Sequence, residues 1–169
     1  MQAAVAVCLR PGPSSLETLF ILRAEDDDDP WSGHVAFPGG HREAGDASLW
    51  ETAIRETKEE TGLDLAADST RLGQLDDVHP RTSVLPSIAI TPCVFTVPPD
   101  AAAHPGPEVA EVAWIPLADL RRPERQGRIE FRGASGVRTF PSFLWGRYEI
   151  WGLTHRILAQ LLEFTEEAR

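Results

Sequence analysis

The chain of 169 residues contains no apolar run near the ~20 residues that a membrane-spanning helix requires. Its first residues, MQAAVAVCLR, also lack the basic start and the small-residue cleavage site of a signal peptide. This segment is more typical of a first strand. We therefore expect a cytoplasmic protein without a membrane partner.

Cysteine and positive charge are scarce as well. The two cysteines, Cys8 and Cys93, both lie in apolar, strand-like segments, so we expect buried free thiols rather than a disulfide. Lys and Arg number 16 against 26 Asp and Glu, which gives a formal net charge of −10. This balance argues against nucleic-acid and membrane-surface binding, because both need basic patches. A polyanionic substrate would require a divalent cation beside it.

Short segments with alternating or continuous apolar residues predict strands at 3–9, 18–23, 34–37, 72–78, 87–97 and 111–115. A β-ribbon is expected across 127–132 and 137–140, a helical turn at 116–120, and one long amphipathic helix over 148–167. The acidic run 25–29 is typical of a solvated loop, with a second cation site as the alternative. We find no internal repeat or linker and expect one domain over 1–169, an α/β sandwich.

Another helix is defined by its two ends. Ser48 followed by Glu51 predicts a capping box, in which each side chain accepts the other residue's free backbone N–H. Gly62 suits the left-handed conformation that follows a helix C-terminus. We therefore expect a helix that begins after Ser48 and ends at Gly62.

Three carboxylates of this helix share one stripe. On a wheel with ~100° per residue, Glu56, Glu59 and Glu60 lie within roughly 100° of arc. The stripe borders the face that we expect to be buried, which consists of Trp50, Ala53, Ile54, Thr57 and Thr61. Like charges at these spacings repel one another, so the stripe is either a solvated face or a cation site. The preceding Gly39-Gly40 favours the cation site, because its backbone can approach substrate phosphates, which Mg²⁺ binds together with carboxylates.

Residues 40–63, GHREAGDASLWETAIRETKEETGL, closely resemble the Nudix box, whose core is Arg-Glu-apolar-x-Glu-Glu-x-Gly-apolar. Thr57 alone departs in type, since an aliphatic residue is usual there. The resemblance implies an α/β/α sandwich with a mixed central sheet and flanking helices. It also implies hydrolysis, dependent on Mg²⁺ or Mn²⁺, of a nucleoside diphosphate linked to another group.

The resemblance also implies roles for individual residues. Glu56, Glu59 and Glu60 would bind the metal, and the carbonyl of Gly40 would add a ligand. Glu56, Glu59 and Arg55 would belong to the catalytic group, in which Arg55 orients the carboxylates by charge-assisted hydrogen bonds. The general base would come from a later loop, with Glu108 and Glu111 as candidates and the box glutamates as alternatives.

The box is one residue longer than usual, follows FPGG and contains Asp46, features that resemble the coenzyme A pyrophosphatase branch. The pair Arg23-Ala24 departs from the Arg-Ser expected upstream in that branch. The branch implies coenzyme A or a derivative as substrate. The alternatives are ADP-ribose, a dinucleoside polyphosphate, or a non-catalytic nucleotide sensor.

A small nucleotide diphosphate is therefore the expected partner. The candidates for contacting it are Gly39, Gly40, His34, Arg42 and Arg81, with His79 as a further candidate and Trp31 or Trp145 as stacking residues. Histidines in strands and aromatic residues in loops also serve ordinary packing, so each has a structural alternative. Trp114, Phe143 and Trp151 are expected in the core or in the interface of a homodimer.

Overall fold

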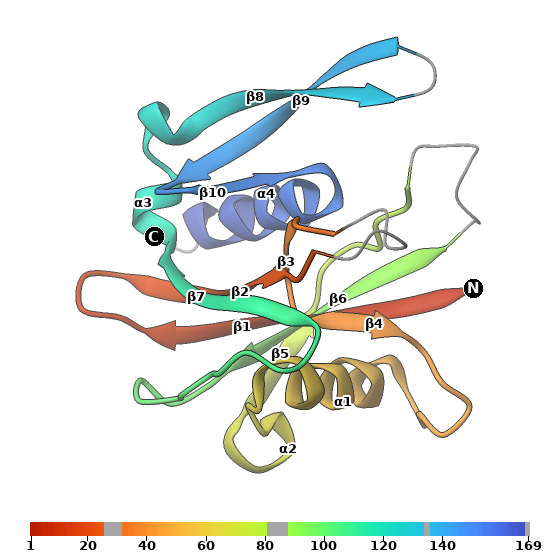
Figure 1. Ribbon diagram of the computed structural model, residues 1–169. Helices are drawn as coiled ribbons and strands as arrows, with labels where there is room; N and C mark the ends of the chain where they lie inside the picture. The colour runs from red at the N-terminus through yellow and green to blue at the C-terminus, as the bar shows by residue number, and fades with distance from the viewer. Residues whose placement is uncertain (26–31, 81–87, 134–135, 168–169) are drawn as a thin grey trace.

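The computed structural model describes residues 1–25, 32–80, 88–133 and 136–167. A seven-stranded mixed sheet forms its centre (Figure 1). β1 (Gln2–Pro11) and β6 (Ala89–Thr96) pair in parallel in the middle of the sheet, and its other strand pairs are antiparallel. The other five strands are β2 (Leu16–Arg23), β3 (Val35–Ala36), β4 (Gly39–His41), β5 (Thr70–Gln74) and β7 (Val109–Pro116).

Helices cover both faces of this sheet (Figure 1). On one face lie α1 (Leu49–Thr61) and α2 (Leu65–Asp68), where Ala53 and Leu65 share a buried cluster with β1. On the other face lies α4 (Gly152–Glu167), whose Leu158 packs in a second cluster with Val7. The predicted α/β/α sandwich with a mixed central sheet is confirmed. Two short segments, α3 (Leu117–Leu120) and the 3₁₀ turn η1 (Pro123–Arg125), follow β7, and α3 confirms the turn predicted at 116–120.

A second sheet lies on the α4 side (Figure 1). Its three antiparallel strands are β8 (Gln126–Gly133), β9 (Gly136–Trp145) and β10 (Tyr148–Trp151), so the predicted ribbon is confirmed and extended. The helix predicted over 148–167 was wrong in its first turn, which is β10. The positions of Ile150 and Trp151 fit the spacing of a helix as well as that of a strand. Ile150, however, pairs with Phe143 of β9 and is fully buried. Gly152, with φ 65°, is the first residue of α4 and follows this strand directly.

The structure also bears on the predictions for the two cysteines and for the strand at 72–78. Cys8 and Cys93 are free and buried, and burial raises the pKa of the Cys8 thiol far above its usual range. The strand predicted over 72–78 ends at Gln74, after which Val78 forms an isolated bridge to Ile90. Within the described ranges, no helix is long and apolar enough to cross a membrane. Trp31, Arg81 and most of the acidic run lie outside the described residues.

Candidate metal and diphosphate site

Helix α1, which carries the acidic stripe, is held at both ends as its sequence predicts. The Ser48 hydroxyl accepts the N–H of Glu51 at 3.3 Å, and Gly62, with φ 69°, donates its N–H to the Lys58 carbonyl at 2.9 Å. The other half of the expected capping box is replaced by a different contact. The Glu51 carboxylate faces the guanidinium of Arg71 at 3.6 Å.

The buried face of α1 differs from the predicted one by a small rotation. Ala53, Thr57 and Thr61 are buried as expected, whereas Trp50 and Ile54 are half-buried and Glu60 is buried in their place. The Thr57 hydroxyl donates to the Ala53 carbonyl at 2.7 Å. This bond explains why a hydroxyl is tolerated where an aliphatic residue is usual in the box: no polar group is left unsatisfied.

Arg55 is the hub of the site. Its Nε and Nη2 donate to the two carboxylate oxygens of Asp46 at 3.1 and 3.0 Å, a bidentate pair. Its Nη1 donates to Glu56 at 2.9 Å and lies 3.4 Å from Glu59. Asp46 also accepts the hydroxyl of Thr52 at 2.9 Å, and the Arg55 bonds hold the pKa of the Asp46 carboxyl well below its usual range. The loop before α1 therefore fixes Arg55, and Arg55 fixes two box glutamates.

Glu60 is the buried member of the acidic stripe, with 7% of its surface exposed. One carboxylate oxygen accepts the N–H of Gly39 at 2.8 Å, and the other lies 3.8 Å from Arg23. Burial, together with repulsion from Glu56, outweighs these contacts and raises the pKa of Glu60 to about 7. Burial also raises the pKa of Glu56. Two neighbouring carboxylates therefore carry negative charge that the protein only partly compensates.

Gly39 and Gly40 allow β4 to lie between β1 and α1. A Cβ on Gly39, whose φ is 156°, would stand 2.3 Å from the carbonyl oxygen of Ala4. A Cβ on Gly40 would stand 2.5 Å from the carboxyl group of Glu56. The pair of glycines is therefore required for the close approach of this strand to the acidic stripe.

The two candidate bases lie in different surroundings. Glu108 is exposed, and its negative charge contributes to the raised pKa of Glu60. The loop that carries Glu108 docks on the end of α1, because Gly106 donates its N–H to the Glu60 carbonyl at 2.8 Å. The structure therefore brings Glu108 toward the box.

Glu111 lies in β7, where successive side chains alternate between the two faces of the sheet. Its side chain lies on the same face of the strand as those of Ala113 and Ile115, which pack on the α4 side, opposite α1. Its carboxylate accepts the hydroxyl of Tyr148 at 2.7 Å and pairs with Arg147. These bonds lower the pKa of Glu111, which makes the carboxylate a weak proton acceptor.

The predicted substrate residues do not form one group. His34 packs edge-on against Trp151, with ring centres 4.9 Å apart. Arg42 donates to the carbonyl of Asp46 at 3.2 Å and to the Gln2 side chain at 3.1 Å. These hydrogen bonds stabilise the loop before α1. His79 contacts the carbonyl of Ile88 at 3.1 Å.

Two residues outside the predicted set belong to the site. Arg23, at the end of β2, is the cation that faces buried Glu60, and Asp46 anchors Arg55. The sequence signal for Asp46 is its place in the box loop. The sequence signal for Arg23 is the expected upstream Arg-Ser pair, of which it matches the arginine.

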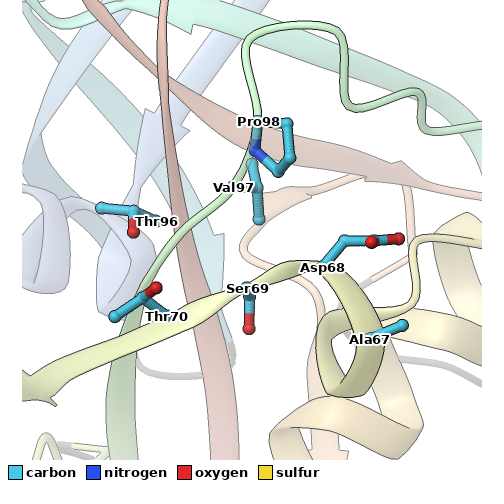
Figure 2. Close-up of a pocket in the computed structure, with 7 residues that line it drawn as sticks. All are labelled: Ala67, Asp68, Ser69, Thr70, Thr96, Val97 and Pro98. Atoms are coloured by element: carbon cyan, nitrogen blue, oxygen red, sulfur yellow. The ribbon is translucent and has the colours of Figure 1, made fainter.

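Other aromatic candidates and hollows lie apart from the box. Trp145 donates its ring N–H to Asp119 at 3.3 Å and stacks on Tyr148. Figure 2 shows a hollow between the α2–β5 junction and the end of β6, where Asp68 is the one charged side chain among the labelled residues. Trp114 lies under the guanidinium of Arg10, 4.1 Å from the ring centre.

The carboxylates of the box are groups that bind hard divalent cations, but their oxygens are not arranged around one. Within the described ranges, no three Asp, Glu, His or Cys side chains stand in coordinating geometry. The reason is that Arg55 holds Glu56 and Glu59 while the N–H of Gly39 holds Glu60. Carboxylates are the ligands that Mg²⁺ and Mn²⁺ prefer, and small side-chain rotations would release these oxygens.

Comparison with known proteins identifies the family. The model of the NUDIX domain matches residues 1–132. The Nudix hydrolase NudL of Yersinia enterocolitica, itself uncharacterized, is 34% identical over 94% of this chain and 77% of its own length. The crystal structure of RenU, a Nudix hydrolase from M. smegmatis, has a TM-score of 0.59 over 70% of this chain and 72% of that one, at 21% identity. The chain therefore belongs to the Nudix family.

Two further relatives are longer than this chain. The mitochondrial coenzyme A diphosphatase NUDT8 of Homo sapiens is 35% identical over 89% of this chain. An uncharacterized protein of Schizosaccharomyces pombe is 38% identical over 75% of it. The chain spans 62% of the human protein and 40% of the yeast protein.

Proposed function

We propose that this chain is a Nudix pyrophosphohydrolase that requires Mg²⁺ or Mn²⁺. The observation that carries the proposal is the pair formed by Glu56 and Glu60: burial destabilises the negative charge of both carboxylates, and repulsion from neighbouring carboxylates adds to this effect. A divalent cation would relieve this repulsion. Family membership and the matching acids of the box support the same conclusion.

In this proposal the cation would be held by the carboxylates of Glu56, Glu59 and Glu60 and by the carbonyl of Gly40. When bound, such a cation neutralises diphosphate charge and lowers the pKa of water. Arg55 keeps the carboxylates of Glu56 and Glu59 on one side of α1, through the bonds described above.

The remaining step is removal of a proton from the attacking water. We assign Glu108 as the base, because it is exposed beside Glu60 and accepts no hydrogen bond through its carboxylate among the described residues. Glu111 is the second candidate, disfavoured by its bonds to Tyr148 and Arg147. Water then adds to phosphorus, and the bridging oxygen leaves with the other phosphate.

We propose coenzyme A, or a derivative of it, as the substrate. Two supports are the names of the human and mouse NUDT8 relatives, coenzyme A diphosphatases at 35% and 34% identity, and the sequence FPGG before the longer box. We assign contacts with the substrate to Gly39, Gly40, His34, Arg42 and Arg81, and Arg81 remains a prediction from the sequence.

The test is a substrate panel with Mg²⁺ or Mn²⁺, in which products are identified by mass. Coenzyme A should yield 4′-phosphopantetheine and adenosine 3′,5′-bisphosphate. Rapid cleavage of ADP-ribose or a dinucleoside polyphosphate, with coenzyme A untouched, would overturn the substrate assignment. Binding of these compounds without turnover of any of them would identify a sensor instead of an enzyme.

Variants test the site itself. Glu56→Gln and Glu60→Gln should each reduce turnover by more than a hundredfold. The matched control is Lys58→Gln, because Lys58 lies on the same helix, is exposed and pairs with Asp64 away from the acids. Full activity in both glutamine variants would refute the metal-site assignment.

A further inference from the structure

Strand β8 lies at the edge of its sheet. In the three-stranded sheet it pairs only with β9 among the described strands, and the hairpin that it forms with β9 stands out from the body of the molecule (Figure 1). An edge strand presents a row of unpaired N–H and C=O groups that can bind another strand. At eight residues, β8 is long enough to do so.

The charges on this edge complement those of a second copy of the same strand. Arg128 and Glu130 are both exposed, and neither forms an ion pair within the described residues. They flank Ile129 symmetrically. If two copies of β8 pair antiparallel about a two-fold axis through Ile129, each Arg128 stands directly opposite Glu130 of the second copy. Opposite charges at directly paired positions stabilise antiparallel strands.

The same register also matches the apolar residues. It places Phe131, which is 43% exposed, opposite Gly127 of the second copy. Leu144, 36% exposed, borders Gly127, since a Cβ on that glycine would lie 3.0 Å from a Leu144 methyl group. The Phe131 ring, which packs against Trp151 of its own chain with ring centres 5.5 Å apart, would then lie beside the Leu144 side chain that covers Gly127 of the second copy.

We propose that this protein forms a homodimer by antiparallel pairing of β8 with β8 of a second copy, in the register centred on Ile129. The two three-stranded sheets then become one continuous sheet across the two-fold axis. The paired edge is short, so the interface is small and the dimer dissociates on dilution. The proposal does not depend on the catalytic assignments, whose residues lie on α1, on β4 and in the loop before β7.

Sedimentation over a concentration series tests the charge register. Arg128→Glu and Glu130→Arg should each raise the dimer dissociation constant about tenfold or more, because two attractive pairs become repulsive. The double variant, with the charges exchanged, should restore dimerisation. Arg138→Glu is the matched control, because Arg138 is exposed on β9 and its reversal changes the net charge equally without altering the edge.

Disulfide trapping tests the two-fold axis. In an Ile129→Cys variant the two cysteines face each other across the axis, within reach of a disulfide, and should form a covalent dimer on mild oxidation. In Glu130→Cys the two cysteines stand two residues apart along the strands, beyond the ~7 Å limit for a disulfide, and should not. The native Cys8 and Cys93 are buried and do not compete.

A monomer at millimolar concentration would overturn the proposal. So would a dimer that Arg128→Glu leaves intact, a double variant that stays monomeric, or equal trapping of the two cysteine variants. Unchanged thermal unfolding midpoints, measured at concentrations where every variant is monomeric, would show that the chain still folds in each case.

Discussion

Replacement of buried Glu60 by glutamine should make the metal-free protein more stable at high pH. Glutamine keeps the side-chain oxygen that accepts the Gly39 N–H but removes a charge that is largely buried. A pKa of about 7 in the folded state, against 4.5 as the ordinary value, corresponds to about 3 kcal/mol of destabilisation once the group is fully ionised. The attraction of Arg23 is already included in this value, because it is one of the causes that set the pKa of Glu60.

The sign follows from proton binding. Between pH 4.5 and 7 the folded protein keeps the Glu60 proton while the unfolded chain loses it, so the stability of the wild type falls as pH rises through this window. The Glu60→Gln variant has no ionisable group at this position, so its stability does not fall in this way as pH rises. The stability difference between the two proteins should therefore be near zero at pH 4.5 and reach about 2–3 kcal/mol in favour of the variant at pH 8.

The assay is urea unfolding in EDTA at several pH values, with linear extrapolation to water. Glu59→Gln is the control, since the Glu59 side chain is 60% exposed and its replacement should change stability by less than about 0.5 kcal/mol. A Glu60→Gln advantage that is absent at pH 8, or equal at pH 4.5 and 8, would refute the assignment of Glu60 as a destabilised buried charge.

Three further predictions concern the surroundings of the acidic stripe. Asp46→Asn should destabilise the protein by about 1–3 kcal/mol and reduce turnover more than tenfold, because Arg55 loses its bidentate partner; urea unfolding and steady-state kinetics measure both effects. Gly40→Ala should reduce turnover at least tenfold by displacing the carboxylate of Glu56, whereas Gly45→Ala, with no atom within 4 Å of the new Cβ, should leave kinetics unchanged. Removal of divalent cations with EDTA should abolish hydrolysis, and added Mg²⁺ should restore it and raise the melting temperature.

Local features of the sequence determined much of this protein. Ser48 and Gly62 define the ends of α1 because caps act within a few residues of a helix end. Short continuous apolar runs identified β1 and β2, because strands that are buried on both faces of a sheet are apolar at successive positions. The acidic stripe follows from helical geometry alone.

Some residues look alike in the sequence but have different surroundings in the protein. Only the tertiary structure decided what each of them contacts. The helical wheel treats Glu59 and Glu60 alike. In the structure the N–H of Gly39, brought close by β4, donates to the carboxylate of Glu60, while Glu59 faces solvent. Glu108 and Glu111 are three residues apart, yet one lies beside α1 and the other bonds Tyr148 in the second sheet.

The segment Tyr148–Trp151 gives the clearest example of this division. Its apolar residues fit the period of the helix that follows, and pairing with β9 makes it a strand. Local spacing reports which side of an element is apolar. Which element forms, and what its polar side meets, depends on pairing between segments distant in the chain, which no short window of sequence contains.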